Sequence, residues 1–360
     1  MMEKKIISGI QQIGIGIHNV AEAWKWYKDT FGTDIRVFED KTIAELMLPY
    51  TGGVARRRHA ALALNLQGGG GFEIWQYTER TPKNVDFEVQ LGDLGIYAAK
   101  VKCRDLHQTY RSYQRRKVRV LAPPMKGPDG HETFFVEDPY GNLFQLMEGN
   151  HWYKDEKKLT GGAYGAVIGV SDVEASMKVY SDILGYDQVI YDQNQRFDDL
   201  DPLPGGDHPF RRVLLTHSEP RQGGFSPLLG DSWIELVEVK NRQPRKIYKD
   251  RFWGDPGFIH LCFDIHGMDL LKKECQDKGF SFTVDSNVHH NKSHSFDMGE
   301  AAGHFSYIED PDGTLIEFVE THKVPVLKKW GWYINLRKRN PHKPLPNWMI
   351  KAMSFNRVRF

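Results

Sequence analysis

Residues 138–145, DPYGNLFQ, and residues 310–317, DPDGTLIE, are two versions of one phrase. Each is a tight Asp-Pro-x-Gly turn that runs into an apolar strand with a single polar residue on it. That residue is the amide Gln145 in the first copy and the carboxylate Glu317 in the second. A phrase written twice, with a ligand-capable side chain changed between the copies, indicates an internal duplication whose copies differ in chemistry.

The segments around the two copies repeat as well. Residues 10–34 and residues 166–187 each contain an alternating apolar strand, a polar helix cap, an amphipathic helix and a glycine at its end. Strand, helix and strand follow again in residues 94–120 and in residues 257–282. A period of this length predicts two duplicated domains, since the repeats of a solenoid are much shorter. The resulting four β-α-β-β-β units span about 8–80, 92–149, 163–240 and 256–321.

Composition places the chain among ordinary globular proteins. Its 360 residues, 40% of them hydrophobic, are enough to bury two cores. A formal net charge of +1 gives no overall attraction to nucleic acid, and no apolar run reaches the length of a membrane span. The three cysteines, Cys103, Cys262 and Cys275, have neither disulfide-framework nor metal-site spacing, and the N-terminus shows no secretion signal. These features predict reduced thiols in a cytoplasmic protein.

The last 38 residues, 323–360, differ from the rest in composition. They contain ten Lys or Arg and no Asp or Glu, with aromatic residues such as Trp330 and Trp348 interleaved. Such a tail could bind nucleic acid or an anionic membrane, or it could fold back on the body of the protein or on a partner subunit. Because many large aromatic side chains are unfavourable in solvent, we expect the tail to dock with its tryptophans buried.

The order of these motifs resembles the vicinal oxygen chelate superfamily, which includes glyoxalase I, methylmalonyl-CoA epimerase, bleomycin-resistance proteins and extradiol dioxygenases. The resemblance rests on GIGIHNVAEAWKWY (14–27), GFIHLCFDI (257–265) and DPDGTLIEF (310–318). It implies an α+β fold of tandem duplicated glyoxalase-like domains, in which four βαβββ modules form two open cup-shaped sheets. On this basis we expect glyoxalase-like domains at 1–150 and 160–322, followed by the basic aromatic tail.

In this family a divalent metal lies inside the cup, on residues of the first and last strands of each unit. In chain order the resemblance places these positions at Gln12, Glu73, Ala98, Gln145, Gly165, Glu235, His260 and Glu317. It implies a structural first half and a metal site in the second half, on His260, Glu317 and Glu235, with a missing ligand at Gly165. Fe²⁺, Mn²⁺, Zn²⁺, Ni²⁺ or Co²⁺ would suit these ligands. A carboxylate on an apolar strand is costly to bury unless it binds metal or pairs with a charge, so Glu235 could instead be a catalytic base or a salt-bridge partner.

Three functions follow from the resemblance. The first is a metal-dependent isomerase, epimerase or lyase that acts on a small oxygen-chelating substrate through a metal-stabilised enolate, with Glu235 and Glu317 as catalytic acid and base. The second is an Fe(II)-dependent extradiol or 2-oxo-acid dioxygenase, which the chain length favours and the absence of a histidine at Gly165 opposes. The third is a metal-free small-molecule binding protein. None of them involves nucleic acid, and a homodimer stays open because four units can form complete cups in one chain.

Overall fold

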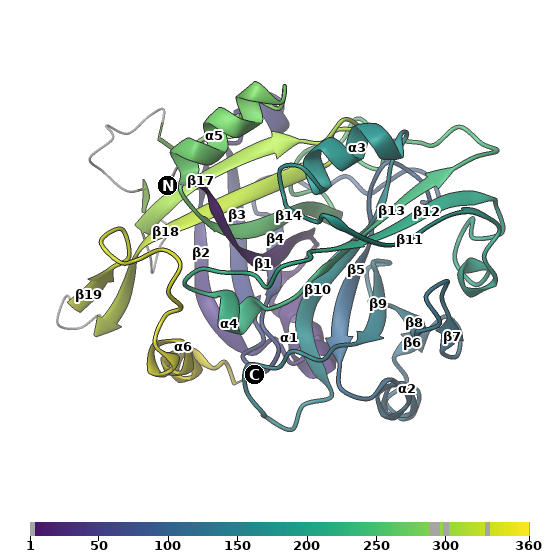
Figure 1. Ribbon diagram of the computed structural model, residues 1–360, viewed down its shortest axis with the longest axis horizontal. Helices are drawn as coiled ribbons and strands as arrows, with labels where there is room; N and C mark the ends of the chain where they lie inside the picture. Colours follow the sequence, from purple (N-terminus) through teal and green to yellow (C-terminus); the bar gives the residue numbers. More distant parts are fainter. Residues whose placement is uncertain (1–3, 288–295, 298–301, 328–331, 360) are drawn as a thin grey trace.

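The computed structural model describes residues 4–287, 296–297, 302–327 and 332–359, and it consists of two large mixed sheets with helices packed on them (Figure 1). The first sheet has the strand order β15-β17-β18-β14-β1-β4-β3-β2, with β16 and β19 paired off this path. Its strands are β1 (Ile6–Gly16), β2 (Ile35–Ala44), β3 (Arg56–Leu64), β4 (Gly71–Tyr77), β14 (Gly257–His266), β15 (Val284–Asp285), β16 (Phe296–Asp297), β17 (Ala302–Glu309), β18 (Leu315–Leu327) and β19 (Trp332–Asn335).

The second sheet has the strand order β11-β12-β13-β10-β5-β9-β8-β6, with β7 paired to β8. Its strands are β5 (Gly95–Cys103), β6 (Arg119–Val120), β7 (Met125–Lys126), β8 (Glu132–Glu137), β9 (Leu143–Glu148), β10 (Thr160–Gly169), β11 (Gln188–Gln195), β12 (Phe210–Thr216) and β13 (Trp233–Val239). The helices are α1 (Val20–Phe31), α2 (Leu106–Arg115), α3 (Val173–Tyr180), α4 (Ser226–Leu229), α5 (Met268–Asp277) and α6 (Asn347–Ala352). Within the described residues no helix is both long and apolar enough to cross a bilayer.

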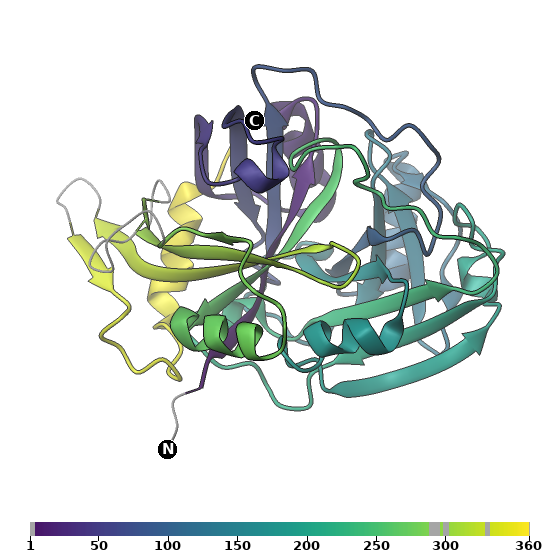
Figure 2. The ribbon, with the colours of Figure 1, turned by 90° about the horizontal axis from the view of Figure 1, so that it is seen from above.

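The duplicated α+β fold predicted from the repeats is confirmed, but each sheet combines units from both halves of the chain. Units one and four share the first sheet through the antiparallel pair β1–β14. Units two and three share the second sheet through the antiparallel pair β5–β10. Figure 2 shows β1, in dark purple, running through the middle of the molecule. Side chains that the sequence groups by half are therefore regrouped by sheet.

The two Asp-Pro-x-Gly turns have the same structural role. The Asp138 carboxylate accepts the backbone N–H groups two and four residues later, both at 2.8 Å, and the Tyr27 hydroxyl at 2.6 Å. Asp310 accepts the equivalent N–H groups at 2.9 and 2.8 Å and the Tyr180 hydroxyl at 2.9 Å. Each aspartate thus closes its own turn and fastens it to the helix of the preceding unit, α1 or α3.

One apolar core joins the two sheets. It contains Ile13 and Leu261 from the first sheet and Val101 and Ile168 from the second, all fully buried. The predicted helix punctuation contributes to it, because α1 begins after Asn19, whose side chain accepts two backbone N–H groups, and ends at a left-handed glycine. The sheets are consequently held in a fixed relation, which fixes the side chains on their central strands.

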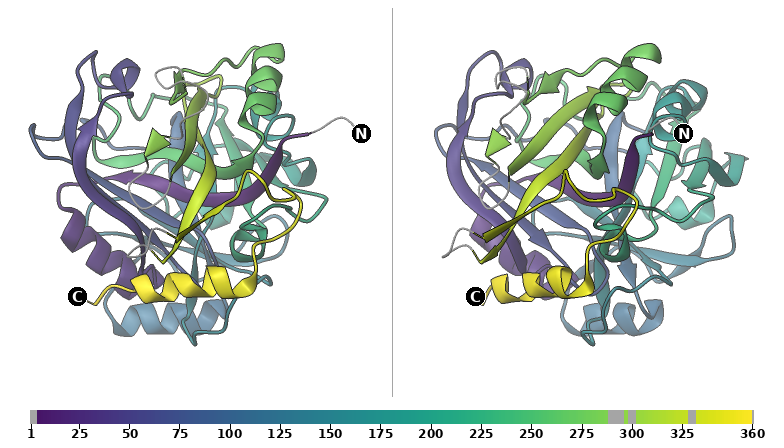
Figure 3. Two further views of the ribbon diagram at one scale, coloured as in Figure 1. Left: turned by 90° about the vertical axis from the view of Figure 1, so that its left-hand side faces the viewer. Right: turned by 60° about the vertical axis from the view of Figure 1, so that its left-hand side comes forward.

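The basic tail folds back onto the body, as expected (Figure 3). Leu345 and Ile350 are buried against apolar side chains of β2, β3 and α4. Arg357 forms ion pairs with two carboxylates of the body. The expectation of buried tryptophans is wrong for Trp348, which is 58% exposed, and Trp330 lies outside the described residues.

Candidate metal centre

Four neighbouring strands at the centre of the first sheet bring four polar side chains together. Glu317 lies on β18, His260 on β14, Gln12 on β1 and Glu73 on β4, which is the spatial order of these strands. In the strand register, Gly14 lies opposite both His260 and Glu73. Unit one therefore supplies two of the four side chains and unit four supplies the other two.

The four side chains are in mutual contact and are buried. The Gln12 amide nitrogen donates to Oε2 of Glu73 at 3.2 Å and to Oε2 of Glu317 at 3.4 Å. His260 Nε2 lies 3.3 Å from the same Glu73 oxygen and 3.1 Å from the same Glu317 oxygen. None of the four side chains is more than a tenth exposed, and ligand atoms of Glu73, His260 and Glu317 lie within 4.8 Å of one another. One imidazole, two carboxylates and an amide thus converge on one point.

Unsatisfied atoms in this cluster fit a bound cation. The Gln12 amide oxygen and His260 Nδ1 are buried without a hydrogen-bond partner, and His260 Nε2 contacts the two carboxylates without a well-aligned hydrogen bond. Such atoms are costly to bury, and an amide oxygen and the unprotonated nitrogen of an imidazole are lone-pair donors of a kind that divalent metals accept. A divalent ion at the centre of the cluster would bind His260 through Nε2, the nitrogen that faces the carboxylates, together with the Gln12 amide oxygen, Glu73 and Glu317.

The electrostatics of the cluster point the same way. Burial lowers the pKa of His260, but the Glu317 and Glu73 carboxylates outweigh this effect and raise it to about 9. Burial raises the pKa of Glu317, and the neighbouring imidazolium more than compensates, so that the net shift is downward. The two carboxylates therefore attract a positive charge into the cluster, and a metal ion would compete with a proton for His260.

Aromatic side chains enclose the imidazole. The Trp253 ring stacks on His260 with the centroids 6.2 Å apart, and Tyr307 meets it edge-on at 5.7 Å. Trp75 packs edge-on against Trp253 at 4.7 Å. On the remaining side the ring needs Gly14, because a Cβ there would overlap its atoms. The cluster therefore lies in an apolar box, in which electrostatic interactions are stronger than in water.

Of the three residues predicted to share a site, the structure brings His260 and Glu317 together and places Glu235 elsewhere. Glu235 lies on β13 in the second sheet, where it accepts Lys100 Nζ at 2.5 Å and the Tyr191 hydroxyl at 3.0 Å. Its geometry is that of a salt-bridge partner, and the expected grouping with His260 and Glu317 is corrected accordingly. The cluster is completed instead by Gln12 and Glu73, two residues of the half for which the resemblance implies a structural role. The antiparallel joint between β1 and β14, which brings them in, has no signature in the local sequence.

The first and second sheets form the first and second cups. The second cup contains a buried cation, Lys100, at the position where the first cup gathers its candidate ligands. Lys100 lies opposite Gln145 in the strand register, as Cys262 lies opposite Glu317. Its ammonium donates to Gln145 and to Glu235, which occupy two of the four metal positions expected from the resemblance. The other two positions are Ala98 and Gly165, which offer no side-chain ligand.

This internal cation belongs to a balanced ion cluster. Arg212 donates to Glu235 and, at 2.7 and 2.9 Å, to both oxygens of Asp199. The cluster thus contains two cations and two carboxylates, all buried. Burial raises the pKa of Glu235, but Arg212 and Lys100 outweigh it and lower the pKa to about 2. The buried charges of the second cup therefore neutralise one another.

Two cups built from four βαβββ units, with a cluster of ligand-type side chains in one of them, define the architecture of vicinal oxygen chelate proteins. The sequence model of the Glyoxalase/Bleomycin resistance protein/Dioxygenase superfamily matches residues 9–146 and 165–318. The chain belongs to this superfamily.

Solved structures share the fold at low sequence identity. Glyoxalase I from Zea mays is 12% identical, with a TM-score of 0.51 over 88% of this chain and 92% of that one. A protein described as a putative dioxygenase from Bacillus subtilis subsp. subtilis str. 168 is 11% identical, with a TM-score of 0.56 over 99% of this chain and 98% of that one. No curated protein sequence matches the chain significantly. These likenesses support the fold and leave the reaction open.

Proposed function

We propose that the protein is a divalent-metal-dependent enzyme of isomerase, epimerase or lyase type, acting on a small molecule with two adjacent oxygens. The main support is the convergence of Gln12, Glu73, His260 and Glu317, whose Gln12 amide oxygen is buried without a hydrogen-bond partner. These four side chains would hold the ion. When bound, it would supply Lewis acidity that stabilises negative charge on the substrate oxygens.

The residues of the chain divide the remaining work. Glu317 would accept and return the proton next to the substrate carbonyl, and Glu73 is the matched second carboxylate. The Gln12 amide touches both carboxylates and sets their orientation. Trp253 and Tyr307 exclude water from the imidazole, which keeps the local dielectric low. The cytoplasmic location and the small-molecule partner expected from the sequence belong to this proposal.

A dioxygenase is the weaker alternative. Iron centres that activate oxygen commonly use two histidines and one carboxylate. The cluster of described residues contains one histidine, His260, and its first-strand counterpart is Gln12. The ligand chemistry therefore favours proton transfer over oxygen activation.

Metal analysis of the purified protein tests the proposal. We expect bound divalent metal in the wild type, and its loss in His260→Ala and Glu317→Ala. Glu235→Gln is the matched control, because it changes a buried glutamate in the other cup and should keep the metal. Equal metal content in all variants would place the ion elsewhere, and a wild type without metal would support a binding protein.

The reaction class needs a second measurement on the metal-loaded protein. We expect solvent deuterium to enter the carbon next to the carbonyl of 2-oxo or 2-hydroxy carbonyl compounds, and Glu317→Gln to abolish this exchange while Glu235→Gln keeps it. Oxygen consumption with a catechol or a 2-oxo acid, without such exchange, would decide for the dioxygenase instead.

A further inference from the structure

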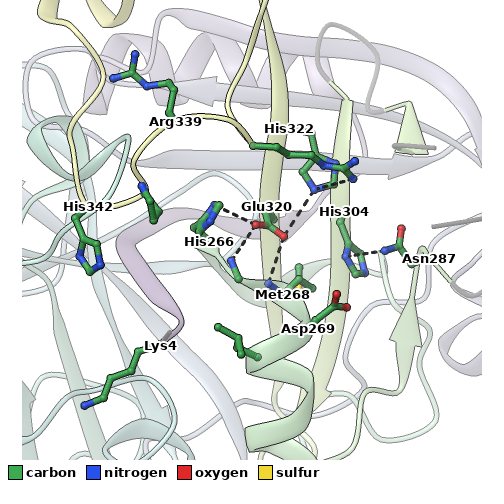
Figure 4. Close-up of a pocket in the computed structure, with 14 residues that line it drawn as sticks. Lys4, His266, Met268, Asp269, Asn287, His304, Glu320, His322, Arg339 and His342 are labelled. Atoms are coloured by element: carbon green, nitrogen blue, oxygen red, sulfur yellow. Dashed lines mark hydrogen bonds and ion pairs between the residues drawn. The ribbon is translucent and has the colours of Figure 1, made fainter. Parts of the chain in front are cut away.

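A cavity lies at the carboxyl ends of β14 and β18, the strands that hold His260 and Glu317. It has a volume of 630 Å³, within the usual range for small-molecule sites. His266, the last residue of β14, lines it together with the first turn of α5, and Glu320 and His322 of β18 form its centre (Figure 4). The segment that follows β19 forms another wall. This cavity is separate from the cluster around His260 and does not take part in the proposed reaction.

The carboxylate at its centre is already satisfied by the protein. Glu320 accepts the backbone N–H groups of Gly267 at 2.9 Å and Met268 at 3.3 Å, and lies 3.2 Å from His266 Nδ1. Burial raises the pKa of Glu320, but hydrogen bonds from His322 and Gly267 and the charge of His266 lower it to about 2. The Glu320 carboxylate thus accepts the free N–H groups at the start of α5, and it also holds the neighbouring His266 and His322 rings in place.

Hydrogen bonds orient the cationic wall. Arg337 Nη2 donates to His322 Nδ1 at 2.8 Å, so that the Nε2 side of that ring faces Glu320. His304 is held by Asp285, with Nε2 2.7 Å from the carboxylate. Figure 4 shows His266 and His322 on either side of Glu320, with Arg339, His342 and Lys4 around them. The basic residues therefore line one cavity from several segments of the chain, and the Arg339 guanidinium donates to the Pro344 carbonyl at 3.2 Å at its edge.

The cavity has more positive than negative charge. Lys4, Arg337 and Arg339 line it, and in the part of the chain that the structure describes none of them pairs with a carboxylate. The lining carboxylates are Glu320 and Asp269, so the formal charge is +1 before any of the four lining histidines is protonated. Guanidinium groups beside imidazoles are well suited to phosphate, which accepts paired hydrogen bonds from arginine.

This arrangement also accounts for the basic tail. Arg337, Arg339 and His342 come from it, and the burial of Leu345 and Ile350 just beyond fixes their place. These basic residues line a concave site of small-molecule size. A binding surface for nucleic acid would instead spread its cations over an extended face.

We propose that the cavity binds a phosphate-bearing small molecule of about nucleotide size, with Arg337 and Arg339 on the phosphate groups. Isothermal titration calorimetry of the full-length chain, freed of metal with a chelator, tests this with inorganic pyrophosphate as the probe. We expect saturable, salt-sensitive binding in the wild type. Arg337→Gln/Arg339→Gln should weaken it by at least about 10-fold, the smallest effect expected for the loss of even one charge-assisted hydrogen bond.

Two controls separate this site from other basic surfaces and from the metal centre. Arg196→Gln changes an exposed arginine that binds Asp201, and Glu317→Gln changes the candidate metal centre; both should bind pyrophosphate like the wild type. If the double variant does not fold, Lys4→Gln at the exposed rim replaces it and should weaken binding. No saturable binding in the wild type, unchanged binding in the cavity variants, or equal binding of citrate would overturn the proposal.

Discussion

Lys100→Met removes the internal cation of the second cup. Methionine has a similar length and flexibility, so the change deletes charge while leaving little empty space. In the wild type two cations face Glu235 and Asp199, and in the variant Arg212 alone remains. The buried cluster then has a net charge of −1, and Gln145 loses its donor.

The expected cost follows from the burial of these groups. Removing one partner of a buried ion pair typically costs about 3–5 kcal/mol, because the other charge stays buried. Glu235 keeps its contacts with Arg212 and the Tyr191 hydroxyl, so we expect a loss near the lower end, about 3 kcal/mol. With an unfolding entropy of about 2.1 cal/mol/K per residue, this corresponds to about 4 °C in Tm.

Urea unfolding monitored by circular dichroism measures this loss of unfolding free energy. The double variant Lys100→Met/Glu235→Gln restores charge balance, because Arg212 and Asp199 remain as a neutral pair. It should therefore be more stable than Lys100→Met alone, although it contains one more substitution. A Lys100→Met variant within about 1 kcal/mol of the wild type, or costs that simply add in the double variant, would refute the idea that Lys100 neutralises this cup.

Three further substitutions test other parts of the structure. Gly14→Ala should lower metal affinity with an unchanged circular dichroism spectrum, because the new Cβ would overlap the His260 ring; Gly224→Ala, where a Cβ makes ordinary contacts, is the control. Burial raises the pKa of Asp264 to about 7, so the folded state retains a proton that the unfolded state loses, and stability falls as pH rises from about 4 through 7. The Asp264→Asn variant should accordingly gain up to about 4 kcal/mol in unfolding free energy relative to wild type at pH 8.5, and much less at pH 4. Thermal unfolding at the two pH values measures this difference, and an equal gain at both would contradict the prediction. Tyr180→Phe removes the hydroxyl that fastens the second Asp-Pro-x-Gly turn and should cost about 1–3 kcal/mol in urea unfolding, whereas Tyr153→Phe, which loses a bond to an exposed backbone carbonyl, should cost less.

The sequence was sufficient to predict the fold because the duplication is local and repeated. The Asp-Pro-x-Gly turns, the Asn19 cap and the alternating strands each follow from side chains within a few residues of one another. Their physical causes are short hydrogen bonds and the alternation of strand faces, both of which can be recognised in a linear pattern. The four units were predicted on that basis, whereas the two cup-shaped sheets were expected from the family resemblance and the grouping of units one with four and two with three was not predicted.

The composition of the candidate site could be predicted only in part. His260 and Glu317 were expected together because both belong to unit four, and their strands pair in parallel. Gln12 and Glu73 were recognised as ligand-type positions, yet chain order suggested that unit one pairs with unit two. The actual pairing of β1 with β14 joins residues about 250 positions apart, and either apolar strand could have paired elsewhere without changing its local pattern.

Charge balance explains why the equivalent ligand positions of the two cups differ in their chemistry. In the first cup, the two carboxylates outweigh the one imidazole, which is protonated at neutral pH; a divalent ion that displaced this proton would cancel the charge of −2 on the carboxylates. In the second cup, Lys100 and Arg212 cancel Glu235 and Asp199, so a metal ion there would add uncompensated charge. Lys100 occupies the register position that Cys262 and Gly14 occupy in the first cup, where neither side chain introduces a cation. The lysine at this strand position, together with Arg212 and the missing ligands at Ala98 and Gly165, therefore makes the second cup unsuited to a metal ion, whereas the first cup keeps a negative charge that a cation would neutralise.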